Sequence, residues 1–150
     1  MFRYNDLQRG LNHLCNRNSD GMYMDVDIYI GKAGDVFSSD ECTMETAILL
    51  IRGHIKIELE GKVYEGIRNS EFFDAASCMH TCCGKKAKII CIDNSEILIQ
   101  KIENNKVFDT VFYNVSNISR QIFGEGKLAI TTKRIVTTIF DDSNAPYSNM

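Results

Sequence analysis

The sequence contains little proline, no tryptophan and no long apolar run; its single proline is Pro146. A membrane-spanning helix needs roughly 20 consecutive apolar residues, and no stretch of this chain approaches that length. The polar N-terminus also has no apolar core of the signal-peptide kind. We therefore expect no membrane partner and a cytoplasmic location, in which the six cysteines are reduced thiols.

The chain also has little net charge, −3, and its 17 basic residues are scattered. Proteins that bind nucleic acids usually concentrate basic residues on one face, so we expect no nucleic-acid partner. A length of 150 residues with 44% hydrophobic residues is enough for one soluble domain with its own core.

What the sequence does contain is the period-2 alternation typical of β-strands. Residues 22–30 alternate methionine, valine and isoleucine with tyrosine and aspartate. In residues 54–60, Ile55, Ile57 and Leu59 are expected to point inward, and a tight turn at Glu60-Gly61 leads into a partner strand. Further strands are expected at residues 45–51, 62–67, 87–92, 96–102, 106–115 and 127–140, with a turn at residues 93–95.

Helix signals are limited to the N-terminus, where residues 2–14 are compatible with a short amphipathic helix weakened by Gly10. Seven to nine strands at short, regular spacing predict an all-β sandwich or barrel. We expect a helix or arm over residues 1–20, a β-sandwich domain over residues 21–140 and the beginning of a linker at residues 141–150.

The stretch from residue 78 to residue 83 is the best candidate for metal or thiol chemistry, because it contains Cys78, His80, Cys82 and Cys83. Structural zinc sites usually join two separated pairs of such ligands, and here the second pair is missing. Adjacent Cys82 and Cys83 would also point in opposite directions along a strand. A nucleophilic Cys78 would need a base and an orienting third group, and His80 supplies only the first. We expect these thiols to pack as small apolar side chains, with no metal in this chain.

The remaining motifs point to structural roles. His13, His54 and His80 lie far apart, without the spacing of paired metal ligands, and are expected to be hydrogen-bonded surface or loop residues. The Gly124-Glu125-Gly126 motif is followed by strand-forming residues instead of a helix, so we expect a tight turn and not a phosphate-binding loop.

Two stretches carry more specific patterns. Residues 45–104 contain, in order, Arg52-Gly53-His54, a G-x-x-Y return from Gly61 to Tyr64, a step formed by Arg68, Ser70 and Phe72, a strand from Gly84 to Ala87, and a strand from Asp93 to Ile97. Residues 119–150 contain a G-x-G turn followed by a strand with Arg134. Together these stretches resemble the first cupin module, and the connector to the second, of a bicupin sugar-isomerase family. That family includes 5-deoxy-glucuronate isomerase of inositol breakdown and 5-keto-4-deoxyuronate isomerase of pectin breakdown.

The resemblance implies a cupin-type double-stranded β-helix, or jelly roll, and a metal-dependent aldose–ketose isomerisation of a sugar or sugar acid. In the family the metal ligands, mainly histidines with a glutamate, lie in the second module, which would begin near Tyr147. No family ligand can be carried over to a residue of this chain. The resemblance therefore implies an N-terminal module that is inactive alone, with its divalent metal in a C-terminal half beyond Met150.

Two other functions are open on the sequence. The chain could be a stand-alone, non-catalytic cupin that binds a sugar acid or mediates assembly or regulation. A stand-alone metal cupin enzyme, such as a dioxygenase, is disfavoured because no histidines are paired. We also expect a homo-oligomer, since jelly rolls leave sheet edges that proteins often cover by pairing.

Overall fold

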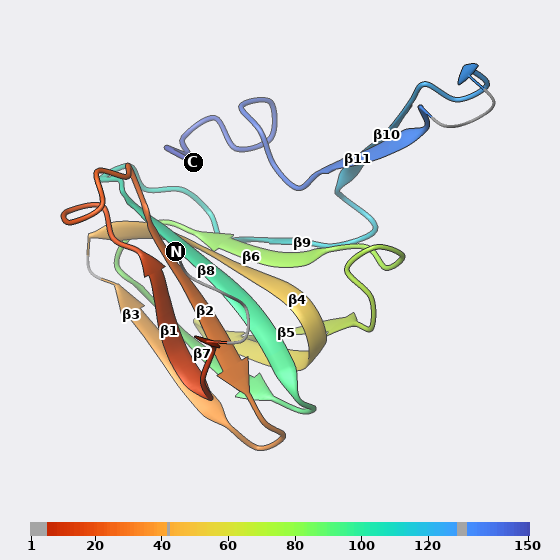
Figure 1. The fold of residues 1–150 in the computed structure, drawn as a ribbon. Coiled ribbons are helices and arrows are strands. Elements are labelled where there is room, and N and C mark those ends of the chain that lie inside the picture. The colour runs from red at the N-terminus through yellow and green to blue at the C-terminus, as the bar shows by residue number, and fades with distance from the viewer. Residues whose placement is uncertain (1–5, 42, 129–131) are drawn as a thin grey trace.

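The computed structural model describes residues 6–41, 43–128 and 132–150, and within them it forms eleven β-strands and no α-helix. Nine strands form the body of the molecule (Figure 1). They are β1 (Gly10–Cys15), β2 (Asp25–Gly31), β3 (Val36–Glu41), β4 (Met44–Leu59), β5 (Lys62–Arg68), β6 (Ser77–Thr81), β7 (Lys85–Cys91), β8 (Ser95–Glu103) and β9 (Val111–Tyr113). The all-β prediction is confirmed. No helix of the described residues is long and apolar enough to cross a membrane.

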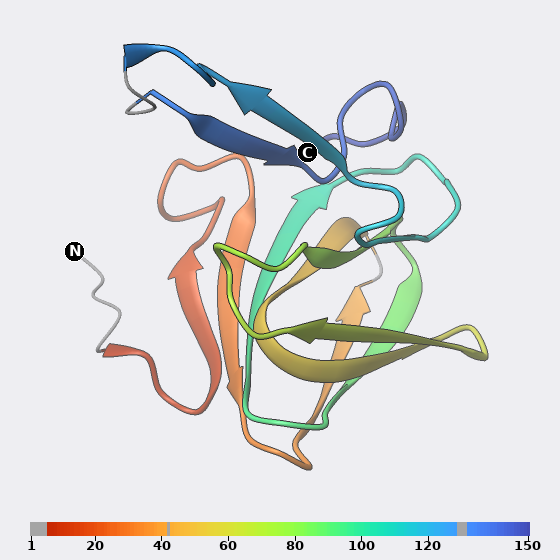
Figure 2. The same ribbon diagram turned by 90° about the vertical axis from the view of Figure 1, so that its right-hand side faces the viewer.

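The strands pair antiparallel in two layers that share one strand. The first layer has the order β1-β2-β8-β4-β6-β9, and the second consists of β3, β7, β4 and β5. The 16-residue β4 belongs to both layers, because its first half pairs with β6 and β8 and its second half with β5 and β7. β4 curves from one layer into the other (Figure 2), and Gly53, with φ of 114°, lies where its pairing with β8 ends and its pairing with β5 begins.

The core fills the space between the layers with aliphatic side chains. Ile55, Ile57 and Leu59 are buried there, as the alternation predicted. The predicted hairpin also forms, with positive φ at Glu60 and Gly61 and β5 as the returning strand. The other buried members of this cluster are Tyr29, Ile48, Leu50, Met79, Ala87, Ile89, Cys91, Ile97 and Ile99.

Strand β2 departs from the simple pattern of its sequence. Its valine and isoleucines are half-buried, whereas Asp27 and Tyr29 on the opposite face are fully buried. Tyr29 packs into the core against Phe37. Oδ1 of Asp27 lies 2.6 Å from Nδ1 of His13 on β1. The face of β2 that carries Asp27 and Tyr29 is therefore the more buried one, and the valine and isoleucine face is only half-buried.

The predicted N-terminal helix is wrong for the residues that the structure describes. Gly10–Cys15 forms β1, which pairs with β2 and begins at Gly10 with φ of 98°, a value incompatible with an α-helix. The free edge of β2 offers a ladder of backbone hydrogen bonds that outweighs a weak helical pattern. Residues 1–5 of that prediction lie outside the described residues. The domain boundaries at residues 20 and 140 stay predictions.

A two-stranded hairpin of β10 (Ser119–Phe123) and β11 (Arg134–Thr138) extends away from the body (Figure 1). The turn predicted at Gly124-Glu125-Gly126 lies between these strands, and both glycines have positive φ. The strand predicted over residues 127–140 is shorter, and its residues 129–131 lie outside the described part of the chain. Likewise, only Val111–Tyr113 of the strand predicted at residues 106–115 is formed.

The chain then returns to the body in a series of turns over residues 141–150, which we call the C-terminal segment. Ile139, Phe140 and Met150 pack on a second cluster of buried residues, Ala47, Cys78 and Tyr113. This cluster lies on the outer side of the β4-β6-β9 sheet, because Ala47 and Cys78 alternate with the core residues Ile48 and Met79. The C-terminal segment thus covers part of the barrel's outer face.

Candidate functional site

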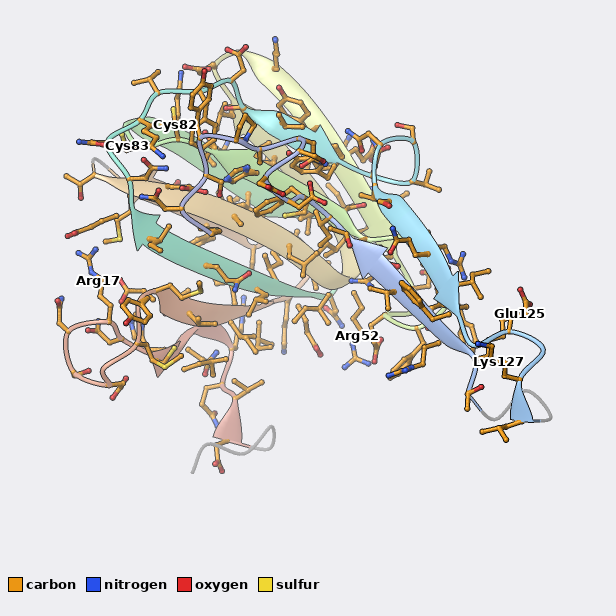
Figure 3. All side chains as sticks on the ribbon, turned by 90° about the horizontal axis from the view of Figure 1, so that it is seen from above. Arg17, Arg52, Cys82, Cys83, Glu125 and Lys127 are labelled. Atoms are coloured by element: carbon orange, nitrogen blue, oxygen red, sulfur yellow. The ribbon has the colours of Figure 1, made fainter. Side chains whose placement is uncertain are left out.

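The four residues singled out in the sequence do not converge on one point. Cys78 and His80 lie on the outer face of β6, whereas Cys82 and Cys83 follow the strand at one end of the barrel (Figure 3). Within the described residues, no group of three or more histidine, cysteine, aspartate or glutamate side chains is arranged to hold a metal ion. Burial raises the pKa of the Cys78 thiol to about 12, which makes it a poor nucleophile at neutral pH.

His80 is instead part of a buried acid–imidazole pair. Its Nε2 lies 2.6 Å from Oε1 of Glu45, and the two side chains are 1% and 0% exposed. The antiparallel pairing of β4 with β6 brings them together, because His80 is directly opposite Ala47, two residues from Glu45 on the same face. The prediction of a surface or loop histidine is therefore wrong for His80.

Glu45 is held as a carboxylate by donors from three parts of the chain. Besides His80, it accepts hydrogen bonds from Asn104 Nδ2 at 2.7 Å, from the Asn149 backbone N–H at 2.9 Å and from the Ser148 hydroxyl. Burial raises the pKa of Glu45, but these hydrogen bonds together outweigh it and lower the pKa to about 2. Since the carboxylate can only accept, Nε2 of His80 carries a proton and donates to it.

Aromatic side chains enclose the imidazole ring. Phe140 stacks on it with a centroid distance of 4.3 Å and an interplanar angle of 3°, and Phe108 lies 4.9 Å away at a tilt of 39°. Tyr113 packs against Phe140 in turn, with centroids 5.5 Å apart. The plane of the His80 ring is thus fixed by stacking, and its Nε2 is committed to Glu45.

A cavity of about 410 Å³ opens next to this pair. It lies outside the barrel, between the β6–β9 edge and the C-terminal segment, and His80 is one of its walls. The other lining residues are Val107, Phe108, Asp109, Val111, Tyr113 and residues 144–148. This cavity with its buried imidazole is the candidate functional site.

The other two histidines agree with the prediction of hydrogen-bonded surface residues. His13 is largely exposed and contacts Asp27 through Nδ1 at 2.6 Å. His54 lies on the outer side of β4, with Nε2 2.7 Å from Glu65. Neither is near the cavity lining.

The sequence pattern did not distinguish Glu45 from the other glutamates, and it placed His80 on the surface. A signal was present, since residues 75–83 contain no charged residue and therefore indicate a buried strand. A histidine within such a run needs a buried partner, but one sequence does not show which carboxylate supplies it.

Comparison with known proteins places the chain in a family. The model of the KduI/IolB family matches residues 4–150. A search of curated proteins finds no match. Among solved structures, an IolB-like protein from Salmonella typhimurium LT2 superposes with a TM-score of 0.81 at 18% identity, covering 92% of this chain and 52% of that protein. The chain therefore spans about half the length of that relative.

Two further structures share the fold at lower similarity. An RmlC-like cupin protein from Desulfovibrio desulfuricans has a TM-score of 0.50 at 12% identity, over 68% of this chain and 89% of that one. A protein from Photorhabdus luminescens has a TM-score of 0.53 at 6% identity, over 69% and 85% of the two chains. With the family match over almost its whole length and this shared jelly roll, the chain belongs to the KduI/IolB family and has the cupin fold.

Proposed function

We propose that this chain is the N-terminal cupin module of a carbohydrate ketol-isomerase-like protein acting on a uronate or deoxy-glucuronate. The observation that carries the proposal is the family match over residues 4–150, in a chain that spans only 52% of its Salmonella relative. In this proposal the metal-dependent aldose–ketose step belongs to a second module beyond Met150, and the present module is inactive alone.

The side chains inside the barrel do not fit a catalytic metal. A divalent ion needs several converging nitrogen, oxygen or thiolate ligands, and the interior is filled by aliphatic residues such as Ile48, Ile57 and Ile99. Outside the barrel, the Glu45 carboxylate is already used by His80 Nε2, Asn104 and the C-terminal segment. We therefore assign this module no step of the isomerisation and propose that it supplies scaffold and packing surface.

The test is a comparison of two proteins. The 150-residue chain and the longer product of the same reading frame are assayed with 5-keto-4-deoxyuronate and 5-deoxy-glucuronate, with manganese or zinc added. We expect isomerisation only by the longer protein, and its loss when a His-x-His pair in the added half is changed to alanine. Equal turnover by the 150-residue chain would refute the proposal that the reaction belongs to the second module.

A stand-alone, non-catalytic cupin that binds a sugar acid or mediates assembly or regulation is the second candidate. The apolar interior of the barrel favours it, because a module of this kind needs no metal site. A stop codon directly after Met150 would make it the better proposal.

A further inference from the structure

The cavity beside His80 has the dimensions of a ligand site. Its volume of about 410 Å³ falls within the roughly 300–1,000 Å³ that small-molecule sites occupy. It lies on the outer face of the barrel, between the β6–β9 edge and the C-terminal segment. What it would bind can be argued from its polar atoms, its walls and its charge.

One ring nitrogen of His80 remains for a bound molecule. Nε2 is committed to Glu45, and Phe140 covers a face of the ring. Among the described residues, none makes a hydrogen bond to Nδ1. A hydroxyl group suits Nδ1, because a hydroxyl can both donate and accept a hydrogen bond.

The walls favour a ring with an apolar face. Phe108, Val111 and Tyr113 form the barrel side of the cavity, and Pro146 and Tyr147 form the side contributed by the C-terminal segment. Aromatic side chains of this kind offer flat, polarisable surfaces to a bound ring.

The charges around the cavity disfavour an anion. Asp109 is in the lining, and the ionised Glu45 lies directly behind His80. Within the described residues, no lysine or arginine lines the cavity. A carboxylate-bearing ligand would therefore lie near the carboxylates of Asp109 and Glu45, with no lysine or arginine in the lining to pair with it.

From these features we propose that the cavity binds an uncharged, hydroxyl-bearing ring compound, whose hydroxyl forms a hydrogen bond with His80 Nδ1 and whose ring packs between the aromatic walls. A neutral sugar and a phenol share this chemistry. A sugar acid is disfavoured, although a uronate is the substrate class proposed for the whole protein.

The proposal is tested by NMR titration of the isotope-labelled 150-residue chain with D-glucose, phenol and D-glucuronate. Glucose and glucuronate form a matched pair that differs in one carboxylate. We expect saturable shifts of the His80 ring and the Ser148 amide with glucose or phenol, and binding of glucuronate about tenfold weaker than that of glucose if the sugar is the ligand. If only phenol gives saturable shifts, the ligand is an aromatic alcohol and not a sugar. The same affinity for glucuronate as for glucose, or no saturable shift with either neutral probe, overturns the proposal.

Two exposed valines provide a steric control. Val107 lines the cavity and is 79% exposed, so Val107→Trp fills the mouth without disturbing the core. Val36, 54% exposed on β3, allows Val36→Trp as the matched variant away from the cavity. We expect the first variant to lose the saturable shifts and the second to keep them. Binding that survives Val107→Trp would place the ligand elsewhere and refute the proposal. Isomerase activity of a longer protein does not enter this readout, so either proposal can fail without the other.

Discussion

At the scale of single residues, Glu45 organises more of the molecule than any sequence motif indicated. Its carboxylate joins β4 to His80 on β6, to Asn104 after β8 and to the C-terminal segment through Ser148 and Asn149. A fully buried charge is costly unless its hydrogen-bonding capacity is used, and here four donors use it. The position of the C-terminal segment therefore depends on the ionisation of this residue.

This dependence predicts a specific acid sensitivity. The pKa of Glu45 is lowered in the folded state from 4.5 to about 2, so its contribution to stability is complete above pH 4.5 and is lost as the pH falls toward 2. The difference corresponds to at most about 3 kcal/mol of the free energy of unfolding. We expect Glu45→Gln to be less stable at neutral pH and to lose less stability between pH 4.5 and 2 than the unsubstituted protein does, measured by urea unfolding across pH.

A half-exposed carboxylate provides the control for that experiment. Glu58 pairs with Lys88 on the surface, and Glu58→Gln should change stability by less than about 1 kcal/mol at any pH. If the stability of Glu45→Gln changes with pH as that of the unsubstituted protein does, ionisation of Glu45 does not contribute to stability as its contacts indicate.

The cysteines of the 78–83 stretch give a second prediction at this scale. Cys78 is buried with a pKa raised to about 12, whereas Cys83 is half-buried at the end of the barrel. Alkylation depends on the thiolate and on access, so Cys83 should react with iodoacetamide well before Cys78. Peptide mass spectrometry of the folded protein at neutral pH measures the order. Modification of Cys78 first would revive a reactive-thiol role.

At the scale of elements, β4 decides the architecture because it serves both layers. Its bend is possible at Gly53, where a Cβ atom would lie 2.4 Å from Ser95 Oγ and 2.6 Å from the Asn94 carbonyl oxygen. The positive φ and the close approach of backbone both require glycine at this position.

Gly53→Ala should therefore destabilise the protein by about 3 kcal/mol or more, since the turn that leads into β8 at Asn94 and Ser95 must move to make room for the added methyl group. Gly61→Ala is the matched control, because Gly61 also has positive φ but meets nothing within 4 Å. We expect it to cost only about 1 kcal/mol, from backbone strain alone. Urea unfolding of both variants gives the comparison, and equal losses would show that crowding at Gly53 is unimportant.

At the scale of the whole molecule, the β10–β11 hairpin is the part least supported by the rest. A two-stranded hairpin is marginally stable by itself in water, yet this one exposes Ile122, Phe123, Ile135 and Val136. Residues 119–138 carry four basic residues and one acidic residue, whereas the whole chain has a net charge of −3. A basic, apolar hairpin on an acidic protein is suited to contact with a second copy.

The expected homo-oligomer stays a prediction, and this hairpin makes it specific. We expect sedimentation velocity to show association that weakens with added salt, because the basic hairpin would contact a second chain whose net charge is negative. Replacing Phe123 and Ile135 with serine should shift the population toward monomer without unfolding the body. A strict monomer at high concentration would contradict the prediction.

Local patterns in the sequence account for much of the fold. The alternation of Ile55, Ile57 and Leu59 with polar residues specified one strand and its inner face, and Glu60-Gly61 specified the turn that follows. These features could be predicted because strand periodicity and turn chemistry are properties of neighbouring residues. Strand β1 could not, since it exists only because β2 offers an edge to pair with.

The sequence by itself thus determined an all-β chain with a core of aliphatic side chains, and its resemblance to a known family indicated the cupin fold. The tertiary structure alone decided that Glu45 meets His80 across 35 residues of chain, and that residues 144–148 return to enclose a cavity beside them. The reason is physical: strand formation follows from side chains a few positions apart, whereas a buried pair and a cavity depend on which strands lie side by side and in what register.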